Sequence, residues 1–260
     1  MAILSIITIN YNNSIGLLKT LNSISSQANK NFEYVIIDGN STDGSVQHIL
    51  DFKHTNYKYL IEKDTGIYNA FNKGINLSTG NFLLFLNSGD EMVNNQITDT
   101  IIKNSNNDNL LSIYALNFIN ENNAVSPYFI TKKINAYYVL KNFIPHPSTI
   151  ISKSLFDKIG FFNENYKYAG DHEFFVRFYL SKYADKFSVH NDLIVNHYLD
   201  GLSNDINNLN TILKEREKAL DENIDNTFIK ESIQFYLEFA KIEFVLFSLK
   251  KWTKKLNLIK

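Results

Sequence analysis

The chain has 260 residues, of which 44% are hydrophobic and 14% aromatic, so it is long enough to bury a substantial core in one large domain or two modest ones. Its 26 basic and 27 acidic side chains give a formal net charge of -1, so no overall field attracts nucleic acid as a partner. The absence of cysteine excludes disulfides, thiolate metal sites and a cysteine nucleophile, and it suits a reducing compartment, with the cytoplasm as the expected location.

The first residues, MAILSIITINYNN, contain an apolar run far shorter than the ~20 residues that a membrane span requires. They show neither a basic n-region nor a cleavage site. The run over 3–9 is rich in β-branched residues, which is typical of a strand buried on both faces. Charges interrupt every later apolar stretch, so the sequence does not predict an integral membrane protein.

The next residues alternate between helical and strand patterns. Apolar residues at helical spacing predict a helix over 15–28, and further helices follow over 46–52 and 66–80. Strand-like runs separate them at 34–38, 57–62 and 81–86. Such alternation predicts an α/β fold with a mostly parallel, Rossmann-like sheet flanked by helices.

The second half of the chain is less regular. Strands are expected near 110–119 and 125–131, a loop entering a strand over 145–152, and a short helix over 153–159. A helix is expected over 171–183 and a pair of strands over 187–199. From 206 to the end, charged and apolar residues recur at helical spacing, which predicts a helical extension.

Polar residues gather where the first four predicted strands end, at 10–11, 38–43, 62–64 and 87–90. The carboxyl ends of parallel strands lie along one edge of a sheet, so these clusters are expected to converge on one ligand site. The first turn, NYNNSIG, lacks the glycines of a dinucleotide fingerprint, and the chain has no P-loop. DGNSTDG follows a strand rather than a helix, which argues against an EF-hand calcium loop.

Five motifs occur in a characteristic order: SIITINYN, IIDGNSTDGS, EKDTGIYNAFNKGI, FLLFLNSGDE and AGDHEFFVR. In this order and spacing they resemble the family 2 glycosyltransferases, which have the GT-A fold, and most closely the bacterial branch that builds surface polysaccharides. The resemblance covers residues 3–205. It implies a catalytic domain over 1–205, with a nucleotide-sugar half (1–95) and an acceptor half (96–205), and a helical extension over 206–260.

The resemblance also implies a set of nucleotide-binding residues in the first half. Asp38 corresponds to the carboxylate that accepts a hydrogen bond from the uracil imide, which favours a UDP-sugar donor, while a turn or capping role is its alternative. The ring of Tyr11 can stack on a base. Lys73 would offset diphosphate charge, or else lie on a solvated helix face. The complete set is Thr8, Asn10, Tyr11, Asp38, Asp64, Asn72, Lys73 and Ser88.

NSGD stands where the family carries its Asp-x-Asp signature, and Asp90 corresponds to the ligand of a divalent cation, Mn²⁺ or Mg²⁺, that bridges the donor phosphates. Asn87 and Gly89 replace the usual acidic partners, so tight metal binding without substrate is not expected. His197 is a candidate second ligand, with a structural role as its alternative.

Asp171 corresponds to the family's general base, at the start of a helix whose dipole favours the ionised carboxylate; a capping role is its alternative. His146 is a candidate acceptor-binding residue or a locally bonded loop histidine. These roles describe an inverting, metal-dependent hexosyl- or N-acetylhexosaminyltransferase that acts on a glycan or lipid-linked hydroxyl in surface polysaccharide (O-antigen or capsule) biosynthesis. A catalytically silent nucleotide-binding or scaffold subunit remains the alternative, because the Asp-x-Asp carboxylates are incomplete.

The C-terminal segment 235–260 has an aromatic-rich amphipathic helical pattern that ends in several lysines. Such a helix can lie in an anionic membrane surface, with Trp252 at headgroup level, on the inner face of the cytoplasmic membrane. It can equally pack on the catalytic domain or in a homodimer.

Overall fold

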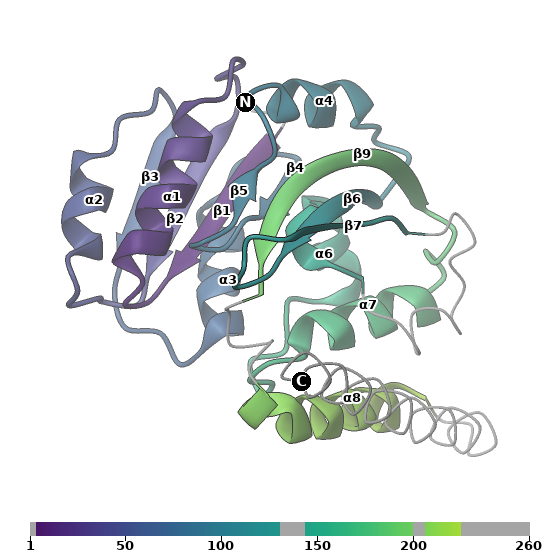
Figure 1. The fold of residues 1–260 in the computed structure, drawn as a ribbon. Helices are drawn as coiled ribbons and strands as arrows, with labels where there is room; N and C mark the ends of the chain where they lie inside the picture. Colours follow the sequence, from purple (N-terminus) through teal and green to yellow (C-terminus); the bar gives the residue numbers. More distant parts are fainter. Residues whose placement is uncertain (1–3, 131–143, 200–205, 225–260) are drawn as a thin grey trace, which may run out of the picture.

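The computed structural model describes residues 4–130, 144–199 and 206–224 (Figure 1). The first part is the predicted alternation of strands and helices. Helices α1 (Ser14–Ser25), α2 (Ser45–Asp51) and α3 (Ile67–Leu77) connect four mutually parallel strands, β1 (Leu4–Asn10), β2 (Glu33–Asp38), β3 (Tyr57–Ile61) and β4 (Phe82–Phe85). The expected α/β class with a mostly parallel first half is therefore confirmed.

One sheet continues from these strands through the second half, in the order β3-β2-β1-β4-β8-β6-β9-β5, with β7 paired to β6. Its added strands are β5 (Glu91–Met92), β6 (Leu111–Ile119), β7 (Val125–Tyr128), β8 (Thr149–Ser152) and β9 (Phe187–Tyr198). β8 is antiparallel to both β4 and β6, whereas β9 is parallel to β6. The sheet therefore becomes mixed where the two halves meet.

The sequence-based expectation was wrong for 187–199, which forms the single long strand β9 rather than two strands. The polar residues Asn191 and Asp192 lie in a bulge: between the pairs Ile113–Val189 and Ala115–Leu193, one residue of β6 lies opposite three residues of β9. A bulge leaves extra residues unpaired without ending the strand. Strand β5 and helix α4 (Ile97–Asn104) were not predicted.

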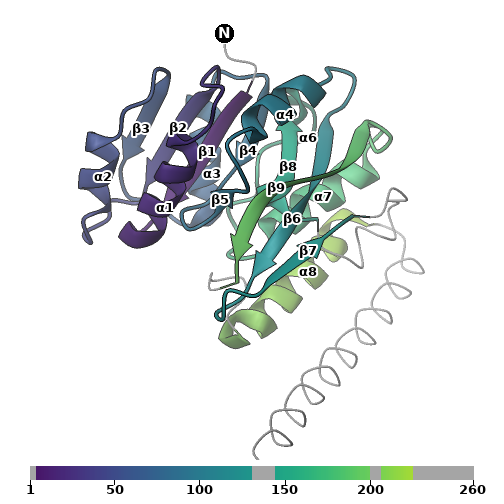
Figure 2. The ribbon, with the colours of Figure 1, turned by 45° about the horizontal axis from the view of Figure 1, so that its top comes forward.

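The two faces of the sheet carry separate apolar cores because successive strand residues point to opposite sides. On β1, Ile6 packs in the core that includes residues of α1, α2 and α4, and Ile7 packs in the core that includes residues of α3, α6 (Lys153–Ile159) and α7 (Gly170–Leu180). Figures 1 and 2 show α1 and α2 on one side of the first strands and α3 on the other.

After β9 the described chain forms a short 3-10 turn (Ile206–Asn208) and then α8 (Leu209–Asn223), which packs beside α7 through Leu220 against Val176. Within the described ranges, no helix is both long and apolar enough to cross a bilayer. Residues 235–260, for which a membrane-surface helix is predicted, lie outside the described residues. The predicted domain boundaries stay predictions.

Candidate active site

Asp38 ends strand β2 and is completely buried. Its Oδ2 accepts hydrogen bonds from Asn10 Nδ2 at 2.7 Å and from the Ser41 hydroxyl at 2.8 Å, while its Oδ1 accepts the Ser41 backbone N–H at 2.7 Å. The pairing of β1 with β2 sets Asn10 directly beside Asp38, which explains the first bond. Asp38 therefore makes the contacts expected of a turn residue. The same contacts also hold its carboxylate in one orientation.

Two further predicted residues, Asp64 and Tyr11, pack closely against Gly39, the neighbour of Asp38. A Cβ atom built on Gly39 would lie 2.6 Å from Asp64 Oδ2 and 2.9 Å from Tyr11 Cδ2, so a side chain at this position would displace both. Burial raises the pKa of Asp64, and the charge of Asp38 raises it further. The Gly66 N–H and the Lys73 charge lower this pKa but do not cancel the rise. Tyr11 is 66% exposed, which leaves its ring accessible to a ligand.

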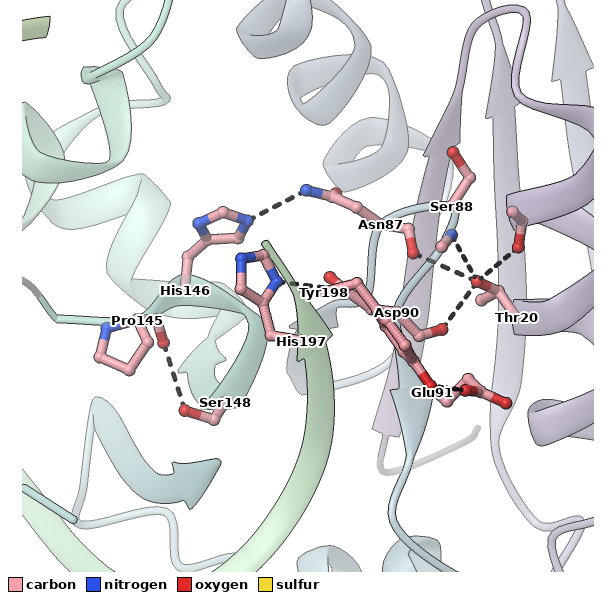
Figure 3. Close-up of polar contacts among 12 residues, drawn as sticks. Thr20, Asn87, Ser88, Asp90, Glu91, Pro145, His146, Ser148, His197 and Tyr198 are labelled. Atoms are coloured by element: carbon pink, nitrogen blue, oxygen red, sulfur yellow. Dashed lines mark hydrogen bonds and ion pairs between the residues drawn. The ribbon is translucent and has the colours of Figure 1, made fainter. Parts of the chain in front are cut away.

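The NSGD turn after β4 is held from helix α1. The Thr20 hydroxyl accepts the Gly89 N–H at 3.0 Å and donates to the Asp90 carbonyl at 2.7 Å (Figure 3). Asn13 Nδ2 donates to the Ser88 carbonyl at 3.1 Å. Gly89 has a φ of +108°, a conformation that L side chains rarely adopt. The turn therefore favours glycine at a position where the family motif carries an acidic residue.

Asp90 and His197, the two predicted metal ligands, are in direct contact. Asp90 is only 4% exposed, and its Oδ1 lies 2.8 Å from His197 Nδ1. The antiparallel pairing of β5 with β9 sets Glu91 opposite Asn196 and so brings the two side chains together. Figure 3 shows the rings of His197 and His146 both facing the turn after β4.

Asp171 lies in the first turn of α7, whose N-cap is Ala169, so the alternative in which Asp171 itself caps the helix does not hold. His146 Nδ1 lies 2.9 Å from its Oδ2, and the Tyr68 hydroxyl donates to its Oδ1 at 3.3 Å. Burial alone would raise the pKa of Asp171, but His146 and the His172 N–H bring it below the ordinary value. The carboxylate is therefore ionised at neutral pH.

A chain of contacts joins this carboxylate to the NSGD turn. Asn87 Nδ2 lies 3.2 Å from His146 Nε2, so His146 bridges Asn87 and Asp171. An ionised carboxylate only accepts hydrogen bonds, so Nδ1 of His146 carries a hydrogen and donates it in the bond to Asp171. Burial and the charge of Asp171 raise the pKa of Tyr68 well above its ordinary value, so its phenol stays protonated and remains a donor.

Other predicted nucleotide-side residues are engaged within the protein. The Thr8 hydroxyl donates to the Leu86 carbonyl at 2.7 Å. Asn72 donates to the Phe162 carbonyl and accepts the Phe162 N–H, and so ties α3 to the loop after α6. Lys73 pairs with Glu62 at 2.8 Å. Ser88 lies in the NSGD turn, where its N–H donates to the Ile9 carbonyl.

Residues 5–161, more than half of the chain, match the family model described as Glycosyl transferase family 2. This chain belongs to glycosyltransferase family 2. An uncharacterized glycosyltransferase of Mycobacterium tuberculosis is 28% identical over 178 residues, 66% of this chain and 67% of that protein. A PGL/p-HBAD biosynthesis glycosyltransferase of Mycobacterium bovis is 28% identical over 172 residues, 60% of this chain and 62% of that protein.

Solved structures show that this glycosyltransferase has the GT-A fold, as expected. The crystal structure of TarS from S. aureus has a TM-score of 0.66 at 20% identity; the match covers 90% of this chain and 42% of that chain, so this glycosyltransferase spans less than half of TarS. The mannosyltransferase PcManGT from Pyrobaculum calidifontis, in complex with GDP-Man and Mn²⁺, has a TM-score of 0.54 at 15% identity and covers 74% of this chain and 55% of that chain.

The sequence did not predict Tyr68 and His146 as the partners of Asp171. Tyr68 and Asp171 are 103 positions apart, and His146 and Asp171 are 25 apart, so no local pattern links them. His146 lies in the IPHPS segment and Tyr68 in the GIYNAF segment, and neither segment has a local pattern that points to Asp171. The spacing of the strand ends was the signal that could have suggested this convergence.

Proposed function

We propose that this glycosyltransferase moves a sugar from a UDP-sugar to a hydroxyl group of a glycan or lipid-linked acceptor, with inversion at the anomeric carbon. One observation carries the proposal. Three buried oxygens at the carboxyl ends of β1 and β4 have no hydrogen-bond partner among the described residues: Asn10 Oδ1, Asn87 Oδ1 and Asp90 Oδ2. Leaving a buried polar atom unpaired costs about 1–3 kcal/mol, so these atoms favour a ligand that brings donors or a cation.

The uracil of the donor is assigned to the Asp38 side. Among the described residues, Asp38 Oδ1 accepts a single hydrogen bond, and a carboxylate oxygen can accept a second, which suits the imide N–H of uracil. The exposed ring of Tyr11 would cover a face of the base. TarS has been solved with UDP and with UDP-GlcNAc, which supports this class of donor for the shared fold.

The diphosphate is assigned to the NSGD turn, together with a divalent cation. Asp90 Oδ2 is a buried carboxylate oxygen with no hydrogen-bond partner among the described residues, so the residues present fit such a cation, with Asp90 and His197 as its protein ligands. Among the described residues no group of three or more His, Cys, Asp or Glu gathers to hold a metal, so the donor phosphates would have to supply the remaining ligands of such a cation. When bound, Mn²⁺ or Mg²⁺ stabilises the charge of the departing diphosphate as a Lewis acid.

Asp171 is assigned the role of general base. Its carboxylate accepts the proton of the acceptor hydroxyl as that oxygen bonds to the anomeric carbon, and the electron pair of the broken sugar–phosphate bond leaves with UDP. The contacts from His146 and Tyr68 hold the carboxylate while this occurs. His146, with a side chain 15% exposed, also faces the acceptor side in this assignment. Lys73 and Ser88 stay assigned to the donor, and Thr8 and Asn72 support the site from within the fold.

The biological setting belongs to the same proposal: bacterial surface polysaccharide biosynthesis in the cytoplasm, with segment 235–260 at the inner membrane face or in a homodimer. The alternative is a catalytically silent nucleotide-binding subunit. Measurable turnover would favour the transferase over this alternative.

The test measures UDP release from UDP-GlcNAc, UDP-glucose and UDP-galactose with Mn²⁺, by hydrolysis or transfer to a simple alcohol. For Asp171→Asn we expect turnover to fall about 10²- to 10⁴-fold, the usual contribution of a general base, with the UDP dissociation constant unchanged. Asp157→Asn, which alters an exposed carboxylate of α6, is the matched control and should behave as wild type. UDP binding without release from any donor would favour the silent subunit, and full turnover by Asp171→Asn would remove Asp171 from the reaction.

A further inference from the structure

Helix α8 lies outside the residues that match the family model, yet it contacts the segment that leads into α7. The Tyr166 hydroxyl donates to Glu222 at 2.7 Å, and the Tyr168 hydroxyl donates to Asn208, just before α8, at 2.9 Å. Figure 2 shows α8 passing along this side of the molecule near α7. These two hydrogen bonds join the region of α8 to side chains of the segment.

Glu215, in the middle of α8, binds that backbone directly. Its Oε1 accepts the N–H of Lys167 at 2.7 Å, and its Oε2 accepts the N–H groups of Tyr168 and Ala169, each at 2.8 Å. Three consecutive backbone donors thus converge on one carboxylate. The N-cap of α7 is Ala169, which provides no side-chain capping bond. Glu215 therefore fixes, from another helix, the backbone of the three residues that end at the N-cap of α7.

The fixed segment ends two residues before Asp171. The contacts of Asp171 with Tyr68 and His146 come from α3 and from the turn before β8, so they form only when α7 begins at the right place. Arg216, the neighbour of Glu215, interacts electrostatically with Asp171 and with His172. Burial and the Arg216 charge lower the pKa of His172 to about 3, so His172 is neutral beside the Asp171 carboxylate.

We propose that Glu215 is a positioning residue for Asp171: it binds the N–H groups of residues 167–169 and thereby holds the proton-accepting carboxylate in place. The inference rests on the proposed function of Asp171 and deepens it. It makes part of the helical extension a component of the catalytic site.

The test compares Glu215→Ala and Glu215→Gln with wild type, using the UDP-release assay. For Glu215→Ala we expect kcat to fall about tenfold to a hundredfold, the scale of a catalytic group misplaced by about 1 Å, with the UDP dissociation constant unchanged. Glu215→Gln keeps one acceptor oxygen and should lie between the two. Glu222→Gln is the matched control, because it retains an acceptor for Tyr166 on the same helix, and it should keep wild-type kcat.

A double variant separates positioning from mere docking. Glu215→Ala should cause no further loss of turnover when added to Asp171→Asn, because Glu215 acts through Asp171 and the two effects are not additive. A purely structural contribution would lower turnover by the same factor on both backgrounds, and that result would overturn the inference. Wild-type kcat for Glu215→Ala would overturn it as well.

The other outcomes are also decisive. If Asp171→Asn keeps full turnover, the proposed base fails and the inference falls with it; if only Glu215→Ala keeps full turnover, the base stands and the inference alone fails. Should Glu215→Ala not fold, as judged by circular dichroism, Glu215→Gln carries the same comparison, and unchanged kcat in that folded variant would count against the inference.

Discussion

Strand β2 begins at Glu33 and ends at Asp38, and both carboxylates are completely buried. Glu33 lies at the edge of the sheet where the parallel strands start. It pairs with Lys58 at 2.7 Å and accepts hydrogen bonds from the Ser5 hydroxyl and from the N–H and hydroxyl of Thr79. Asp38 lies at the opposite edge, where its partners are the neutral groups of Asn10 and Ser41.

Under the proposed function, one strand contributes to stability at its start and to donor binding at its end. At the starting edge, the charge of Glu33 is compensated by a lysine, and that carboxylate ties three strands or their connections together. At the carboxyl edge, the Asp38 carboxylate contacts the neutral donors of Asn10 and Ser41, and Asp64 lies close by with a raised pKa. A buried carboxylate with such partners favours a ligand with an N–H donor or a cation. The residue type is nearly the same at both ends, and the partners decide the role.

The largest effect in this comparison is expected for Glu33→Gln. Glu33 is completely buried and accepts three hydrogen bonds besides the contact from Lys58, whose side chain is 34% exposed; one hydrogen bond to a charged group contributes about 1.5–3 kcal/mol, so a loss of about 3 kcal/mol is expected. The free energy of unfolding, measured in urea, should fall by about that amount, while UDP affinity of the folded protein stays at the wild-type value. Glu62→Gln is the control: its partner is Lys73 and its side chain is half exposed, so about 0–1 kcal/mol is expected.

The pH dependence sharpens the same prediction. Burial would raise the pKa of Glu33, but Lys58, Ser5 and Thr79 bring it below the ordinary value of 4.5. A pKa that is lower in the folded state contributes stability above 4.5 and loses it as the pH falls further. The difference in unfolding free energy between wild type and Glu33→Gln should therefore shrink below pH 4.5. A difference that grows with acid would contradict this account of Glu33.

A smaller effect, confined to binding, is expected for Asp38→Asn. A hydrogen bond to a charged group contributes about 1.5–3 kcal/mol, so UDP should bind roughly tenfold to a hundredfold more weakly by calorimetry. The unfolding free energy should change far less than for Glu33→Gln, because Asn can still accept from Ser41. Asp51→Asn, at an exposed position of α2, serves as the control. Wild-type UDP affinity in Asp38→Asn would break the functional half of the comparison.

The first half of the fold could be predicted because its signals are local. Each parallel strand is a short apolar run, each helix has its own apolar spacing, and the polar clusters mark the strand ends. Those strand ends also predict that Asn10, Asp38 and Asp90 lie on one edge of the sheet. Asp90 with His197 was predicted as a pair only through the family resemblance, and the structure sets the two side chains 2.8 Å apart.

The rest depended on contacts between distant residues. Strand β9 was misjudged because its polar bulge resembles a turn in sequence, although pairing with β6 carries the strand through it. The two-residue strand β5 is too short to leave a pattern. Glu215 lies on a charged helix where one glutamate looks like another, and only the path of residues 167–169 singles it out. Tertiary hydrogen bonds of this kind have no periodic signature.

The most direct test of the central claim is calorimetric binding of UDP, GDP, dTDP and CMP, each with and without Mn²⁺, to wild type and to Asp90→Ala. We predict that UDP binds most tightly, that Mn²⁺ strengthens its binding to wild type, and that Asp90→Ala loses this increment while still binding UDP alone. If no nucleotide binds under either condition, the carboxyl edge of the sheet is not a donor site, and the proposed UDP-sugar transfer is contradicted.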